Sequence, residues 1–261
     1  MLVSLYSAAT GMNAEQRKLD IISNNLSNVE TTGFKRQRAE FQDLLYQAVR
    51  EAGTPTAQDS SLPTGLYVGH GTTLSATNRI FSIGNPEETG GSTDIAIMGD
   101  GFLQVQLQDG RIAYTRDGSL KRDGEGRLTT SNGLLVVPNI VIPANSQEIS
   151  ISPDGIVSVK FADDTIQNLG NMTLVRFVNP AGLKPIGNNL YTQTPASGDP
   201  VEGIPNQDGF GPLQQGYLEK SNVDVVKEMV NMIVAQRAYD INSKTITTSD
   251  EMLRTVSNLK R

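Results

Sequence analysis

The sequence predicts an α+β protein in which long N- and C-terminal helices pair as a coiled coil and flank a central antiparallel β-rich domain. All 12 prolines and 23 of the 25 glycines lie between residues 39 and 221, and these residues break helices. Both ends instead carry apolar side chains at seven-residue spacing, and the centre alternates apolar with polar residues. We therefore expect a discontinuous helical domain (1–33 and 217–261), an extended arm (34–84) and a β-rich outer domain with its connecting segment (85–216).

The first segment is predicted to be an amphipathic helix. Leu5, Met12, Leu19 and Leu26 follow a strict seven-residue spacing, and Ile22 belongs to a companion series. These positions share one helical face, as in the seam of a coiled coil. Three asparagines lie near the end of this segment: Asn24, Asn25 and Asn28. We expect them to make helix-end hydrogen bonds, with Gly33 as a left-handed cap. The basic cluster at 35–38 is expected to have a solvated or helix-dipole role rather than to contact nucleic acid.

The last segment repeats this pattern at Val225, Met232, Tyr239, Ile246 and Leu253. A capping box at 221–224 predicts where the helix begins. A continuous helix over 222–260 would be about 58 Å long, although the β-branched run 245–248 would allow a bend. The two apolar stripes could pair within one chain or with other copies of it.

The centre is predicted to form strands because apolar residues alternate there with polar ones. The expected strands are 94–97, 102–107, 149–151, 156–161 and 172–177. Asp-Gly or Asn-Gly pairs that predict hairpin turns lie at 109–110, 117–118, 123–124, 132–133 and 154–155. Residues 50–79 are rich in Gly, Thr, Ser and Pro, which indicates an extended arm or a mobile loop.

Composition excludes several classes of function. With no cysteine and a single histidine, His70, the chain cannot build a disulfide framework, a zinc finger or a His-pair metal site. The net charge of −6 argues against nucleic-acid binding and is divided into +3 at the ends and −9 in the middle. No apolar run approaches a membrane span, and the start lacks a basic n-region, so we expect no membrane insertion and no cleaved secretory signal. We expect His70 to be an exposed loop residue.

Several motifs resemble the signatures of bacterial flagellar rod and hook proteins. At the N-terminal end these are residues 7–12, 22–29 and 31–35; in the centre, 94–97 and 114–118; and at the C-terminal end, 216–224, 236–239 and 242–244. The signature residues at the two ends are Asn24, Asn25, Asn28, Gly33, Phe34, Gln236, Arg237, Ala238, Tyr239 and Asn242. The segments 36–47 and 48–80 are similar to the distal-rod branch of this family.

The resemblance implies a structural subunit that polymerises into a helical tube and transmits motor torque to the hook. Its implied partners are copies of itself, proximal-rod and hook proteins, the surrounding basal-body rings and the flagellar export apparatus. It also implies that the chain is exported unfolded into the periplasm, and that no catalytic residue, metal or cofactor is involved. The alternatives are a proximal-rod or hook-family axial protein and, from a different class, a β-rich carbohydrate-active enzyme with helical flanks.

Overall fold

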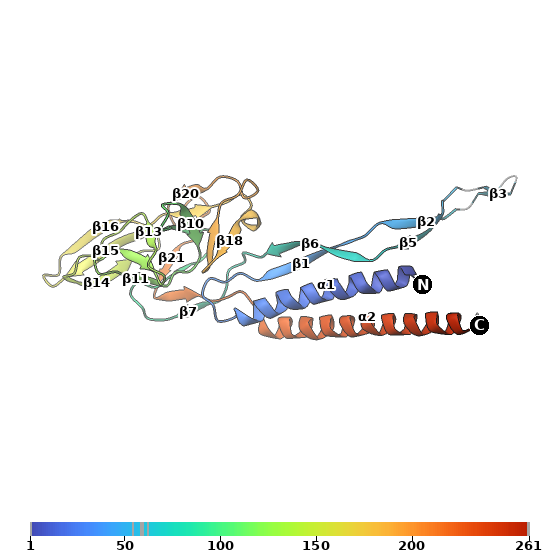
Figure 1. The fold of residues 1–261 in the computed structure, drawn as a ribbon. Coiled ribbons are helices and arrows are strands. Elements are labelled where there is room, and N and C mark those ends of the chain that lie inside the picture. Colours follow the sequence, from blue (N-terminus) through green and yellow to red (C-terminus); the bar gives the residue numbers. More distant parts are fainter. Residues whose placement is uncertain (1, 54, 58–59, 62, 260–261) are drawn as a thin grey trace. The chain divides into compact units, whose positions relative to one another are not determined.

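The computed structural model describes residues 2–53, 55–57, 60–61 and 63–259 of the 261-residue chain. An α-helix lies at each end of the chain and an antiparallel β-rich region lies between them, which confirms the predicted fold class at this level (Figure 1). The chain forms two compact units: a helical unit (1–26, 37–78 and 224–261) and a β unit (27–36 and 79–223). The backbone therefore passes between the two units at four points.

Among the described residues, the largest elements of the helical unit are the two helices α1 (Leu2–Ser27) and α2 (Val225–Leu259). The capping box predicted at 221–224 is wrong, because Ser221 and Val223 are buried in the β unit and Asp224 caps α2 instead. The Asp224 carboxylate accepts a hydrogen bond from the Lys227 backbone N–H at 3.1 Å. At 35 residues, α2 is about 52 Å long.

The β-branched run 245–248 does not interrupt α2. The Thr245 hydroxyl donates to the carbonyl of Ile241 and the Thr248 hydroxyl to that of Lys244, each at 2.9 Å. These bonds to the preceding turn satisfy the hydroxyls inside the helix, so the helix continues.

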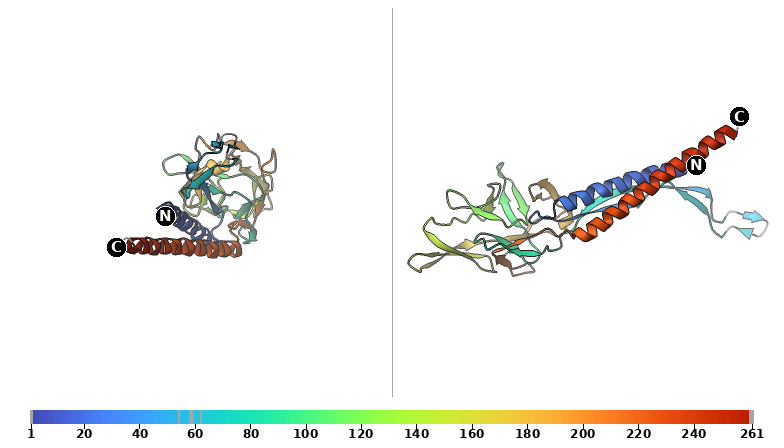
Figure 2. Two further views of the ribbon diagram at one scale, coloured as in Figure 1. Left: turned by 90° about the vertical axis from the view of Figure 1, so that its right-hand side faces the viewer. Right: turned by 90° about the horizontal axis from the view of Figure 1, so that it is seen from below.

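The helices α1 and α2 lie side by side and run in opposite directions (Figures 1 and 2). The side chain of Asn242 in α2 contacts α1 at Gly11, where a Cβ atom would lie 3.0 Å from the side-chain nitrogen of Asn242. Two residues from the opposite ends of the chain therefore meet within one unit.

The arm is a long antiparallel ribbon rather than a loop. Its strands are β1 (Gln37–Asp43), β2 (Tyr46–Arg50), β3 (Pro55–Ala57), β4 (Ser60–Ser61), β5 (Leu66–Gly69) and β6 (Thr72–Arg79). They pair as β1–β6, β2–β5 and β3–β4, with Tyr46 opposite Gly69. The little apolar periodicity of this segment gave no indication of this pairing.

The β unit is built from one seven-stranded antiparallel sheet, one three-stranded sheet and three two-stranded ladders. The seven-stranded sheet has the order β11 (Leu120–Arg122), β12 (Leu128–Thr130), β13 (Leu135–Val137), β9 (Leu103–Gln106), β10 (Ile112–Thr115), β19 (Leu190–Thr192), β18 (Lys184–Gly187). The three-stranded sheet is β14 (Ser146–Ile151), β15 (Ile156–Phe161), β16 (Ile166–Asn171). The ladders pair β17 (Leu174–Arg176) with β20 (Val201–Gly203), β21 (Leu213–Gln215) with β8 (Ile95–Ile97), and β22 (Tyr217–Glu219) with β7 (Pro86–Glu88).

The sheets enclose a core of branched aliphatic side chains and a second, aromatic cluster. The aliphatic core includes Leu103, Val105 and Leu174, each with 0% of its surface exposed. In the aromatic cluster, the ring of Tyr114 meets that of Phe177 edge to face at a centroid distance of 4.8 Å. Burial of this apolar surface is the main force that holds the β unit together.

Four of the five predicted hairpin turns connect paired neighbouring strands, and the fifth is wrong. The pairs at 109–110, 123–124, 132–133 and 154–155 lie in the turns β9–β10, β11–β12, β12–β13 and β14–β15. Asp117-Gly118 makes no hairpin, because β10 pairs with β9 and β19 whereas β11 pairs with β12. A Cβ atom on Gly118 would lie 1.7 Å from the carbonyl oxygen of Ile95, so glycine is required there for a close approach of two backbones.

Candidate functional site

Three charged side chains meet in the interior of the β unit. Lys35 (0% exposed) follows α1, Arg116 (3%) follows β10, and Glu219 (2%) ends β22. The Glu219 carboxylate accepts hydrogen bonds from Lys35 Nζ at 2.5 Å and from Arg116 Nε at 2.9 Å. We call this cluster the ionic joint, since it connects the N-terminal, central and C-terminal parts of the chain.

Backbone groups satisfy the remaining polar atoms of the ionic joint. The Arg116 guanidinium donates to the carbonyls of Ile97, Gly99 and Gly101 at 2.9–3.2 Å. Lys35 Nζ also donates to the Ser82 carbonyl at 2.7 Å. Buried charges are tolerated only with such partners. The hydrogen bonds from Lys35 and Arg116 in turn hold in place the loops that carry these carbonyls.

The ionic joint contains two cations and one carboxylate, and this imbalance affects Lys35. Burial of the ammonium group, and secondarily the neighbouring Arg116, lower the pKa of Lys35 from 10.5 to about 8, while Glu219 acts in the opposite direction. At neutral pH Lys35 is still protonated, so the interior carries one excess positive charge.

Residues on either side of the joint fix the N-terminal segment to the C-terminal one. The Gly33 N–H donates to the Glu219 carbonyl at 2.7 Å, and Phe34 is 7% exposed. The Asn222 side chain accepts from the Arg36 N–H and donates to the Ile80 carbonyl, both at 2.8 Å. Segment 27–36 is therefore bound along its length to the end of the β unit.

The prediction of a solvated basic cluster at 35–38 is wrong for Lys35, which has 0% of its surface exposed. Charge and local pattern cannot reveal that a counter-ion 184 positions further along the chain will cover a lysine. A signal was nevertheless present in the motifs: Lys35, Arg116 and Glu219 lie within 31–35, 114–118 and 216–224 respectively.

Gly33 has the predicted left-handed backbone, with a φ of +66°, but it does not cap α1. The helix ends at Ser27, and a Cβ atom on Gly33 would lie 2.8–3.0 Å from the backbone of Arg116 and Asp117. Glycine at this position lets segment 27–36 pass close to the loop that carries Arg116.

Asn25 holds the start of the arm in the helical unit and is 1% exposed. Its side-chain amide donates to the Gln37 carbonyl at 2.8 Å and its oxygen accepts from the Gln37 N–H at 2.9 Å. The prediction of helix-end bonding is therefore wrong for Asn25, whose amide imitates a strand partner for β1. Asn28 does bond locally, accepting from the Thr31 hydroxyl at 3.1 Å.

The residues of the predicted seam differ in exposure. Ile22 is buried at 4% exposure, whereas Val225 and Tyr239 are exposed at 38% and 37%. The half-buried members are Leu5, Met12, Leu19, Leu26, Met232, Ile246 and Leu253. Among the C-terminal signature residues, Gln236 and Arg237 are exposed while Ala238 and Asn242 are half-buried.

The N-terminal half of α2 presents large apolar side chains to solvent. Members of this exposed face, each 52–71% exposed, are Val226, Met229, Val230, Ile233, Val234 and Ile241. Contiguous apolar surface of this kind on a folded chain marks a site of protein–protein contact.

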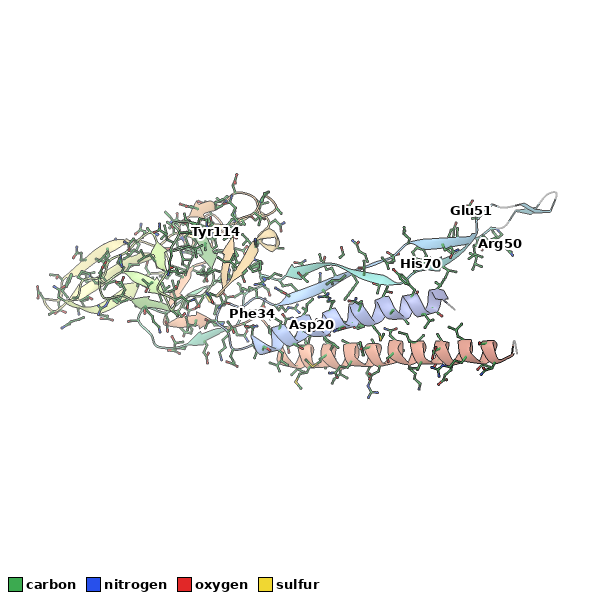
Figure 3. The ribbon with its side chains drawn as sticks, in the orientation of Figure 1. Asp20, Phe34, Arg50, Glu51, His70 and Tyr114 are labelled. Carbon is green, nitrogen blue, oxygen red and sulfur yellow. The ribbon has the colours of Figure 1, made fainter. Side chains whose placement is uncertain are left out.

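The described residues hold no group of three or more His, Asp or Glu side chains that could bind a metal ion. As predicted, His70 lies in a loop, the connection between β5 and β6, but its side chain is half-buried rather than exposed and contacts the arm and α1 (Figure 3). One ring nitrogen lies 3.1 Å from the Leu45 carbonyl, and the ring meets the edge of Tyr6.

None of the helices in the described part of the chain combines the length and apolarity that a membrane crossing needs.

An exposed apolar helix face such as that of α2 is typical of subunits that assemble with other copies. Three family descriptions match successive parts of the sequence: "Flagella basal body rod protein" at 5–35, "Flagellar hook protein FlgE/F/G D1 domain" at 96–159, and "Flagellar basal body rod FlgEFG protein C-terminal" at 214–259.

Whole-length relatives give the same result. The chain is 53% identical over 265 residues to the flagellar basal-body rod protein FlgG of Borreliella burgdorferi, covering all of both chains. It is 48% identical to FlgG of Agrobacterium fabrum, with 98% of this chain and 99% of that protein covered, and 41% identical to FlgG of Bacillus subtilis, with both chains fully covered. The chain belongs to the flagellar basal-body rod protein family, and it is a structural subunit of the basal body.

Proposed function

We propose that this chain builds the distal rod, a helical homopolymer that carries motor torque to the hook. The main support is the similarity over the whole length to rod proteins named FlgG, which no shared domain alone would produce. A contact between copies that does not close on itself generates such a filament. The proposal assigns the chain no catalytic activity and no cofactor.

In this proposal the terminal helices form the inner layer of the tube by pairing as coiled coils. The seam residues Leu19 and Met232 are half-buried in the isolated chain, and apolar residues such as Ile233 are 55% exposed. These side chains have apolar surface left to bury, so contacts with further copies would stabilise the polymer.

For assembly we divide the chain into terminal segments (1–33 and 217–261), an arm (34–84) and an outer domain (85–216). The boundaries of the two compact units differ from this division, because segment 27–36 and the end of the β unit bind each other at the ionic joint. The proposed partners are copies of the chain, the proximal-rod and hook proteins, the surrounding rings and the export apparatus. Contact with nucleic acid and insertion into membrane are not part of the proposal.

A charge placed on the seam tests this function. We expect Leu19→Asp or Met232→Asp to abolish rod formation, because a carboxylate at a contact between helices would have to be desolvated without a partner. The measurement is electron microscopy of isolated basal bodies together with swimming assays, and circular dichroism of the purified variant checks that the β unit is still folded.

The matched control is Ile166→Asp, the same chemical change at an apolar residue that is 75% exposed on β16. We expect this variant to assemble normal rods. Normal rods and motility in the Met232→Asp strain would contradict the proposed role of the seam, and loss of rods in both strains would show that the effect is not specific to it.

A further inference from the structure

Glu219 connects more segments of the β unit than the two that it reaches through its ion pairs. Its carboxylate oxygen Oε1 accepts from Lys35 Nζ and from the Gly84 N–H at 2.8 Å, and Oε2 accepts from Arg116 Nε. Its backbone carbonyl accepts from the Gly33 N–H. A single residue of the C-terminal signature thus binds the N-terminal segment, the loop at Gly84 that follows the arm, and the centre of the β unit.

The two cations have other partners that do not depend on Glu219. Arg116 donates to the carbonyls of Ile97, Gly99 and Gly101, all within the central β region. Lys35 has the Ser82 carbonyl. If the joint closed without Glu219, two positive charges would share the interior with no counter-ion, which is strongly unfavourable.

The sequence separation determines when this counter-ion becomes available. Glu219 lies 184 positions after Lys35 and 103 after Arg116, so the joint is among the least local contacts of the chain. Non-local contacts form only after the entropy of closing the intervening loop has been lost. The central sheets, by contrast, are built largely from hairpins of neighbouring strands.

We propose that Glu219 is the latch that closes the β unit: segment 27–36 docks only when this carboxylate arrives and neutralises the joint. This inference rests on the proposed function, in which the export apparatus is a partner of the chain, and on the unfolded export that the family resemblance implies. A chain whose C-terminal signature is still inside the export apparatus would then have a partly formed central region and a free N-terminal segment. It would become competent for assembly only when both ends are outside.

Hydrogen exchange of the purified full-length chain tests the latch. We expect Glu219→Gln to accelerate amide exchange in segment 27–36 at least tenfold, while strands β9 and β10 keep their protection. The matched control is Glu87→Gln, which removes an exposed carboxylate that pairs with Lys220 beside the same β7–β22 ladder. We expect less than a twofold change in that variant.

Unchanged protection of segment 27–36 in Glu219→Gln would overturn the latch, as would an equal loss of protection in Glu87→Gln. If Glu219→Gln unfolds the whole β unit, the double variant Lys35→Met/Glu219→Gln decides. We expect it to recover protection relative to the single variant, because one of the two unpaired cations is gone. Exchange as fast as in the single variant would refute the role of charge.

The exchange experiment is carried out on the unassembled chain, so its outcome is separate from that of the proposed function. A chain that shows the latch but builds no rods would contradict the function and leave the latch intact. A rod-forming chain in which Glu219→Gln leaves segment 27–36 fully protected would contradict the latch and leave the proposed function intact.

Discussion

Gly33 combines a left-handed backbone with contacts that leave no room for a side chain. Its φ is +66°, and the position of a Cβ atom lies 2.8–3.0 Å from the backbone at 116–117. Gly133 offers a comparison within the same unit, since its φ is +77° and nothing lies within 4 Å of its Cβ position. The two glycines therefore separate the strain of the backbone conformation from the effect of close contact.

We expect Gly33→Ala to lower the free energy of unfolding of the β unit by about 2–4 kcal/mol, because conformational strain and displaced backbone add. Gly133→Ala should cost only about 1 kcal/mol, the strain of the left-handed conformation. Urea denaturation followed by circular dichroism measures both. Equal losses in the two variants would show that the approach of segment 27–36 to Arg116 contributes little.

Lys35 makes the stability of the β unit depend on pH. Its pKa is lowered to about 8 in the folded chain from an ordinary value of 10.5. Between these values the unfolded chain binds the proton and the folded chain does not, so the free energy of unfolding rises with pH across this range. The charged groups that face Lys35 are Glu219 and Arg116. Nearby, Glu87 and Glu30 raise the pKa of Lys220 above its ordinary value.

We expect the wild-type chain to gain about 1–3 kcal/mol of stability between pH 7.5 and pH 9.5 from this group. In Lys35→Met the gain should disappear, because no proton is released on folding at that position. Urea titrations at closely spaced pH values test this, with Lys121→Met, an exposed lysine of β11, as the control that keeps the gain. A profile of Lys35→Met that is parallel to the wild type would contradict the assignment.

Some residue-level features could be predicted from the sequence and others could not. The turn glycines at 110 and 133 were found because their conformation depends only on immediate neighbours. The roles of Asn25 and Lys35 were missed because their partners, the backbone of Gln37 and the carboxylate of Glu219, are supplied by tertiary structure. Local patterns carry no information about such distant partners.

At the scale of elements, prediction succeeded where a strand or helix carries its own periodicity. The strand predicted at 156–161 is β15 with the same bounds, and both terminal helices are present. The ends of the helices were less well predicted: α1 stops at Ser27 and α2 starts at Val225 because segments 28–36 and 221–223 bind the β unit. Tertiary contacts, rather than helix propensity, set these boundaries.

The ribbon of the arm has large apolar side chains in solvent, including Leu45 at 86% and Tyr46 at 58% exposure. A two-stranded ribbon is only marginally stable alone, so these side chains have surface to bury against further copies of the chain. We expect the arm to stiffen the rod by this contact.

Shortening the ribbon in register tests this. Replacement of residues 48–67 by Asn-Gly would join Gln47 to Val68, which already face each other, through a two-residue turn. We expect rods that still assemble but are softer or curved, as measured by electron microscopy of isolated basal bodies. Straight rods of unchanged stiffness would count against a role of the arm in linking subunits.

For the molecule as a whole, charge is distributed unevenly between the units. The β unit has 12 basic and 17 acidic residues, and the helical unit has 10 and 11. Near-neutral helices can pack against many copies of themselves without strong repulsion, while the β unit keeps most of the net negative charge. The sequence showed this division only coarsely, because residues 39–78, with one basic and four acidic side chains, belong to the helical unit and not to the middle.

The four passages of the backbone between the units have a mechanical meaning. A twisting load applied to one unit reaches the other through four covalent connections in parallel, so that each carries only a fraction of the force. A cut in any single connection would leave three intact. Redundant load paths of this kind suit a component that turns continuously, since the failure of one link does not release the part that it drives.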